Sequence, residues 1–117
     1  MKPDIKKRWV EALLSGDYTQ GTLHLNSGGR FCVMGVLCDL YCKETGKEWE
    51  PFGSGGEYYR LFGKDGQLPY QVDEWCGEDV SWHPVPYPGW SGRSFLSTMN
   101  DRGMTFHKLA AIIQEQL

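Results

Sequence analysis

The sequence predicts an α+β fold: a small, mainly helical domain with a central buried helix and a short antiparallel hairpin. The one long apolar run, residues 30–42, covers almost the whole circumference when plotted at about 100° per residue, which is typical of a buried helix. Residues 3–15 and 106–113 repeat apolar side chains at helical spacing, whereas residues 22–31 carry strand and hairpin signals. At 117 residues the chain is long enough for one modest core, so we expect residues 1–117 to form a single domain.

The first elements follow from local signals. In the helix expected over residues 3–15, Ile5, Trp9 and Leu13 share one face, and Gly16 ends the helix. A short strand over residues 22–25 is predicted to lead into a hairpin turn at 26–29. Arg30 and Phe31 then form either the return strand or the entry to the central helix, which we expect to end at Gly46.

The central helix carries a notch in its apolar surface. Cys32, Gly35 and Asp39 fall within about 60° of one another at the helical period. Because Asp is almost never fully buried without a partner, we expect this strip either to meet polar groups from elsewhere or to line a pocket.

The second half of the chain is expected to contain shorter elements. Residues 49–67, rich in Gly and aromatic residues, are predicted to form a long loop, which is usually functional or disordered in a compact domain. The Gly-rich part, residues 52–56, permits phosphate binding through its amides, but it lacks the Lys-Ser/Thr of a P-loop and a flexible linker is equally open. The remaining elements are a helix over 68–75, an extended path over 81–88, a helix from Ser94 to Met99, a turn at 100–103 and a helix capped by Thr105.

Charge and composition exclude several classes of function. The net charge is −3, and no basic cluster follows Lys6-Lys7-Arg8, whereas a duplex-DNA binder needs a concentrated cationic face. Residues 95–113 resemble a helix-turn-helix, but Lys108 is their only basic residue in the recognition position, so we expect no DNA binding. No apolar run approaches membrane-spanning length, and the four Cys are interpreted as reduced, which indicates a cytoplasmic protein without a membrane segment.

Two chemistries that use cysteine were considered. Cys32 at the start of a helix permits a thiol hydrolase, which would need His24, His83 or His107 as its base. None of these histidines lies in a recognisable motif, so a structural or pocket-wall Cys32 is the favoured interpretation. The only short Cys spacing, from Cys38 to Cys42, lies inside the buried helix, so we expect no metal site.

Aromatic residues give the strongest general indication of ligand binding. They make up 14% of the chain, and most fall in loops or at element ends, where they fill small cores or stack on bases. Several Arg residues are distributed so that one or two can meet a phosphate. The aromatic residues are Tyr18, Phe31, Trp49, Phe52, Tyr58, Tyr59, Trp82, Tyr87 and Trp90, and the arginines are Arg30, Arg60, Arg93 and Arg102.

Four motifs follow one another along nearly the whole chain. They are Trp9-x2-Ala12-Leu13-x-Ser15-Gly16-x-Tyr18-x-Gln20-Gly21, Phe31-Cys32-x2-Gly35-Val36-Leu37-Cys38-Asp39, Leu68-Pro69-x2-Val72-x2-Trp75 and Leu96-x3-Asn100-Asp101-x-Gly103-x-Thr105-Phe106. In this order they resemble a family of small phage and prophage proteins. Met34 stands where that family usually has Leu, and Val33 stands where a second Cys is frequent, which weakens any metal or disulfide role.

The resemblance implies a role against host defence. Small phage proteins of this kind include sponges, which bind nucleotide immune signals such as ADP-ribose conjugates or cyclic nucleotides without cleaving them. We therefore expect a non-enzymatic, oligomeric protein without a cofactor that sequesters a nucleotide-derived ligand. The open alternatives are a Cys32-dependent thiol hydrolase and a protein–protein inhibitor of a host enzyme.

The expected ligand site combines residues of the first half of the chain with the 100–103 turn. Phosphate is expected to meet Arg30 and the amides that open the central helix, where the helix dipole favours anions. The pair Asn100-Asp101 has a second interpretation as a helix-capping turn. The predicted ligand-binding residues are Tyr18, Gln20, Arg30, Phe31, Cys32, Asp39, Asn100 and Asp101.

Overall fold

The computed structural model describes all of residues 1–117, and its centre is helix α2 (Val33–Thr45). The other helices are α1 (Pro3–Leu14), α3 (Tyr70–Cys76), α4 (Leu96–Asp101), α5 (Phe106–Gln116) and the 3-10 turn η1 (Val80–Trp82). The strands are β1 (Thr19–Gln20), β2 (Asn26–Ser27), β3 (Arg30–Phe31), β4 (Glu50–Phe52), β5 (Tyr58–Arg60), β6 (Val85–Pro86) and β7 (Arg93–Ser94). The chain is thus a small α+β domain, as the sequence predicts.

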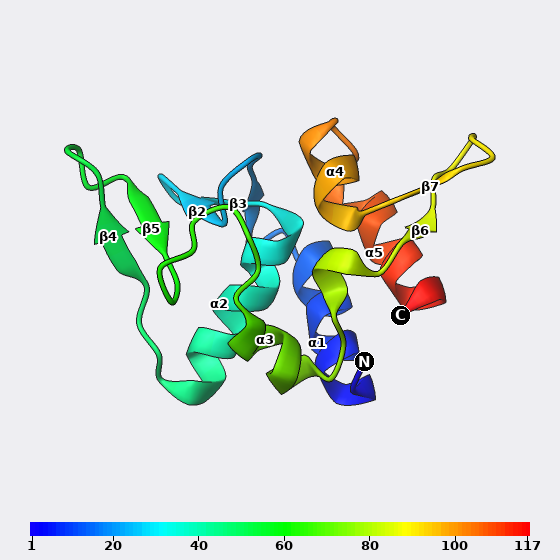
Figure 1. Ribbon diagram of the computed structural model, residues 1–117. Helices are drawn as coiled ribbons and strands as arrows, with labels where there is room; N and C mark the ends of the chain where they lie inside the picture. The colour runs from blue at the N-terminus through cyan, green and yellow to red at the C-terminus, as the bar shows by residue number, and fades with distance from the viewer.

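Helix α2 lies between the larger sheet and the other long helices. Figure 1 shows the sheet on one side of α2 and helices α1 and α5 on the other. Its residues Val33, Val36 and Leu37 are fully buried, which confirms a buried central helix. The indole N–H of the buried Trp9, on α1, donates to the carbonyl of Val33 at 3.1 Å, so that α1 is anchored to the start of α2. No helix is both long and apolar enough to cross a membrane.

The larger sheet has five short strands in the order β1-β3-β2-β5-β4. Strands β2 and β3 form a short antiparallel hairpin, as predicted, but its first strand is Asn26–Ser27, which was predicted as part of the turn. Strand β1 adds to β3 in parallel. A second hairpin, β4–β5, lies within residues 49–67, which were predicted as a loop. That prediction was wrong, because both strands are only three residues long and the hairpin joins the sheet through the pairing of β5 with β2, which no local pattern reveals.

The notch on α2 is occupied by the protein itself. A Cβ atom on Gly35 would lie 1.8 Å from the carbonyl oxygen of Leu25, so glycine alone permits the loop before β2 to touch the helix. Asp39 meets polar groups of other elements, as described below. The predicted strand over residues 22–25 is instead this closely packed loop, in which Leu23 has a left-handed backbone with φ of 68°.

The elements of the second half differ from the predictions mainly at their ends. Helix α4 is capped by Phe95, whereas Ser94 belongs to β7, and Asn100 and Asp101 form the last turn of α4. Thr105 does cap α5, since its hydroxyl accepts from the Lys108 amide at 3.4 Å. All four Cys are free and buried.

Candidate functional site

Asn100, one of the predicted ligand contacts, is fully buried and has a partner for each of its amide groups. Its side-chain oxygen accepts from the Gln20 amide at 2.9 Å and from the Val33 backbone N–H at 3.1 Å. Its side-chain nitrogen donates to the Gly21 carbonyl at 2.9 Å and to Asp101 at 3.3 Å. The four hydrogen bonds join α4, β1 and the start of α2, so Asn100 holds the scaffold together.

Gln20 completes the same network. Its amide nitrogen also donates to the Met104 carbonyl at 2.8 Å, and its oxygen accepts from the Phe106 amide at 3.1 Å. Asp101 accepts from the Leu23 amide at 2.9 Å and fixes the loop before β2. Because these polar groups already have partners, an incoming ligand would have to break hydrogen bonds to use them.

The start of α2 is also inaccessible to a ligand, because its backbone amides are buried. Val33, Met34 and Gly35 are buried, and the Val33 amide is taken by Asn100. The structure therefore leaves no open amides at this helix end, where the phosphate was expected.

Cys32 caps α2 and is buried. Burial raises the pKa of the Cys32 thiol to about 11, and the amides of Gly35 and Met34 lower it by less. Nucleophilic cysteines need the opposite shift. No histidine bonds to Cys32: His24 lies against Asp65, and His83 pairs with Glu78.

Tyr18, Asp39 and Phe31 form a second internal cluster between β1, β3 and α2. The Asp39 carboxylate accepts from the Tyr18 hydroxyl at 2.5 Å and from the Trp49 indole at 3.0 Å, and Lys43 lies 3.2 Å away. Burial and the bond to Asp39 raise the pKa of Tyr18. Phe31 packs edge-on against Tyr18, with ring centroids 5.1 Å apart, so the two rings that were predicted to stack on a ligand contact each other.

Arg30 differs from the other predicted contacts, because it is exposed and makes no ion pair or side-chain hydrogen bond. It lines a polar pocket between β1, β2 and β3. No group of three or more His, Cys, Asp or Glu side chains is placed to hold a metal ion.

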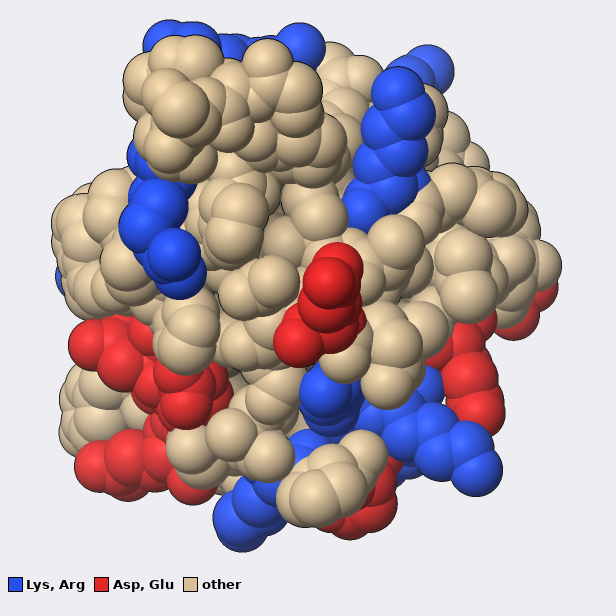
Figure 2. All heavy atoms as spheres, turned by 90° about the vertical axis from the view of Figure 1, so that its right-hand side faces the viewer, with Lys and Arg blue, Asp and Glu red and all other residues tan.

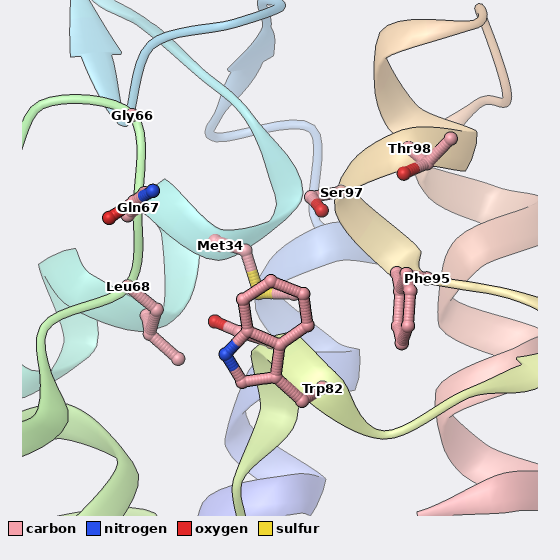
Figure 3. Close-up of a pocket in the computed structure, with 9 residues that line it drawn as sticks. Met34, Gly66, Gln67, Leu68, Trp82, Phe95, Ser97 and Thr98 are labelled. Carbon is pink, nitrogen blue, oxygen red and sulfur yellow. The ribbon is translucent and has the colours of Figure 1, made fainter.

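Another candidate site lies at the other side of α4, where the structure has an open pocket of about 270 Å³ (Figure 3). Its lining residues come from the start of α2, the segment before α3, η1 and α4. In Figure 3 the indole of Trp82 lies in front of Met34, with the ring of Phe95 on one side of it and Leu68 on the other. Trp82 is 69% exposed and meets Phe95 edge-on, with ring centroids 5.6 Å apart. The lining residues are Met34, Gly66, Gln67, Leu68, Ser81, Trp82, Phe95, Ser97 and Thr98.

A second pocket, of about 380 Å³, adjoins the first at Thr98 and is cationic. It is lined by Tyr87, Trp90, Arg93, Ser94, Thr98 and Arg102. Arg102 has no ion-pair partner, and Arg93 donates only to the Pro84 carbonyl at 3.0 Å. In Figure 2 the upper part of this face, at the level of α4 and the β6–β7 hairpin, shows basic side chains without acidic ones. No carboxylate lines either pocket.

We call the two pockets the α4 pockets. They are lined by polar and aromatic side chains, several of which have no hydrogen-bond or ion-pair partner within the protein. They offer the faces of Trp82 and Trp90, the hydroxyls of Ser97 and Thr98, and the guanidinium of Arg102. Such a surface suits a ligand with a planar ring and a negative charge. The sequence indicated these aromatic and Arg residues in general terms, but the distance along the chain between Met34 and Trp82 hid the pocket that they share.

The structure is thus that of a small α+β domain with two pockets beside α4. The chain belongs to the family described as Domain of unknown function (DUF8296), whose pattern it matches over residues 1–117. A search of curated proteins and a search of solved structures returned no match.

Proposed function

We propose that this protein is a phage-encoded anti-defence protein that captures a nucleotide-derived immune signal and holds it without cleaving it. ADP-ribose conjugates and cyclic nucleotides are the signals that we consider. The observation that carries the proposal is the junction of the α4 pockets at Thr98, with aromatic faces on one side and two Arg residues on the other.

The aromatic pocket is suited to a base. The exposed face of Trp82 gives a stacking surface, and stacking on an aromatic side chain contributes about 1–3 kcal/mol per base. Phe95 and Met34 supply apolar walls, whereas Gln67 supplies an amide that can pair with polar edges of a base.

The cationic pocket is suited to phosphate. Arg102 and Arg93 can each donate two parallel N–H groups to a phosphate. Such bidentate hydrogen bonds between charged groups are stronger than those between neutral groups. Ser94 and Thr98 also line this pocket, and Thr98 lines the aromatic pocket as well, so their hydroxyls are available to a ribose or to a second phosphate oxygen.

Binding without cleavage is supported by the chemistry of the lining. Neither pocket contains a carboxylate, His or Cys, so no side chain there is a general base or a strong nucleophile. The buried Cys32 thiol, with its raised pKa, argues against the thiol-hydrolase alternative.

The cellular setting rests on the resemblance to phage proteins. It underlies our expectation that the protein acts in the host cytoplasm as a homo-oligomer, and light scattering after gel filtration would measure that state. The exposed Trp82 and Trp90 also suit a protein interface, since Trp is enriched at such contacts, so a protein–protein inhibitor is the second candidate.

A thermal-shift screen with AMP, ADP-ribose, NAD and cyclic dinucleotides, followed by chromatography of the ligand, tests the proposal. A ligand at 100 times its dissociation constant should stabilise the protein by about 2.7 kcal/mol. Stabilisation with intact ligand supports sequestration, and stabilisation with altered ligand supports an enzyme. No stabilisation by any ligand would contradict nucleotide binding and favour the inhibitor.

A further inference from the structure

The polar pocket beside Arg30 is separate from the α4 pockets and has a different character. It measures about 290 Å³ and has no apolar lining residue. Its lining consists of Gln20, Gly21, Thr22, His24, Ser27 and Arg30. No carboxylate is among them, so the pocket is lined by hydrogen-bond donors together with the amide of Gln20.

Cross-strand pairing places the two central donors on one face of the sheet. Ser27 on β2 lies opposite Arg30 on β3, and it also lies opposite Tyr58 on β5. Directly opposite residues point to the same face, so the Arg30 and Ser27 side chains stand next to each other. Neither the Arg30 guanidinium nor the Ser27 hydroxyl has a partner within the protein.

The other donors come from the loop over residues 21–25. The Thr22 hydroxyl has no partner within the protein. The His24 ring packs on Tyr58 at a centroid distance of 4.9 Å, and its Nδ1 lies 3.5 Å from Asp65. Since the two ring nitrogens point in different directions, Nε2 stays free to donate or accept away from Asp65.

The loop is held rigidly in an unusual conformation. Gly21 donates to the Phe31 carbonyl at 2.8 Å, Leu23 donates to Asp101, and Leu25 donates to the Asp65 carbonyl at 2.6 Å. Leu23 has an exposed side chain and a φ of 68°, a left-handed backbone conformation that residues other than glycine seldom adopt. Strained backbone fixed by its surroundings is typical of functional sites, where it pre-organises the binding groups.

We propose that this pocket binds a phosphoryl-type oxyanion, a phosphate or pyrophosphate group, through Arg30, Ser27 and Thr22. Its wholly polar lining suits an oxyanion and not a base or another apolar group. The site does not depend on nucleotide binding in the α4 pockets. The oxyanion is either free or the phosphate arm of a nucleotide.

The test is a titration of the ¹⁵N-labelled protein with sodium pyrophosphate and, separately, with AMP at matched ionic strength. We expect the backbone signals of Thr22, Ser27 and Arg30 to move with saturation. Arg30→Gln keeps most of the side chain and should weaken this binding by about tenfold or more, since a hydrogen bond to a charged group is lost. Arg60→Gln is the matched control, because it removes the same charge from β5 on the same sheet and should leave the affinity unchanged.

The outcomes separate this inference from the proposed function. Trp82→Ala should leave the pyrophosphate response of the loop unchanged, whether or not nucleotides bind at α4. A response to pyrophosphate alone would support a free oxyanion, and an equal response to AMP would support a nucleotide phosphate. Unmoved loop signals, movement confined to residues 93–102, or equal weakening by Arg30→Gln and Arg60→Gln would each overturn the inference.

Discussion

The two sides of α4 contain similar polar residues, but these differ in burial and in whether they have hydrogen-bond partners within the protein. At its C-terminal end, Asn100 is fully buried and each of its amide groups has a partner. On another face of the helix, Ser97, Thr98 and the C-capping residue Arg102, which has no ion-pair partner, border open pockets, and the exposed Trp82 lines one of them. In this protein, the polar side chains that hold the fold together have their hydrogen-bond partners within the chain, whereas most of those that border the pockets do not.

The largest effect is expected on the scaffold side, from Gly35→Ala. The added Cβ atom would lie 1.8 Å from the Leu25 carbonyl oxygen, so the loop before β2 would have to move away from α2. We expect a destabilisation of at least about 3 kcal/mol, measured by urea unfolding. Gly16→Ala is a useful control, since its Cβ would meet nothing within 4 Å and only its φ of 81°, which Gly35 does not share, opposes the change. Equal losses in both variants would contradict the close approach at Gly35.

Asn100→Ala should have the next largest effect. The change leaves the buried amide of Val33 and the carbonyl of Gly21 without their side-chain partner. We expect a loss of about 3 kcal/mol, because each orphaned buried group costs about 1–3 kcal/mol. Thr98→Ala, on the other side of the same helix, should change the unfolding free energy by less than about 0.5 kcal/mol. Comparable losses from both variants would show that the two sides of α4 do not differ.

Variants of the α4 pockets should affect binding and leave stability nearly unchanged. Trp82→Ala removes an exposed stacking face, and Arg102→Gln removes an unpaired charge. For a nucleotide that stabilises the wild type, each variant should weaken binding by about tenfold, measured by calorimetry. Arg8→Gln, which affects a cation paired with Glu44 on the surface, is the control. Wild-type affinity in both pocket variants would place the ligand elsewhere.

A smaller, pH-dependent effect is expected at Asp73, outside both regions. Burial raises the pKa of the Asp73 carboxyl from 3.8 to about 6, and nearby Asp79 and Glu78 add to the rise. Between these values the folded state binds more protons than the unfolded state, so stability should fall as pH rises from about 4 to about 6 and then stay level.

Asp73→Asn keeps an oxygen for the Val80 amide but cannot ionise. Urea midpoints from pH 4 to pH 8 should therefore fall less steeply in this variant than in the wild type. Parallel profiles would contradict the raised pKa.

Much of the fold was predictable, because α1, α2 and α5 carry periodic apolar faces that depend on local sequence alone. Strands β4 and β5 were not predictable, since their hairpin depends on the pairing of β5 with β2, which is distant in the sequence. The candidate site was harder to predict from the sequence than the helices were. Gln20 and Asn100 are 80 residues apart, and only the folded chain shows that they pair with each other. A sequence pattern gives the chemical type of a side chain but not whether its partner lies inside the protein.

The five tryptophans allow the most direct test of this account. The indole N–H groups of Trp9, Trp49 and Trp75 donate to Val33, Asp39 and Glu44, whereas those of Trp82 and Trp90 have no partner in the protein. The decisive measurement is a ¹H–¹⁵N spectrum of the indole groups during titration with ADP-ribose. We predict that the Trp82 and Trp90 signals move and that the other three stay in place. Movement of the Trp49 signal with Trp82 and Trp90 unmoved, or no movement at millimolar ligand, would contradict binding in the α4 pockets.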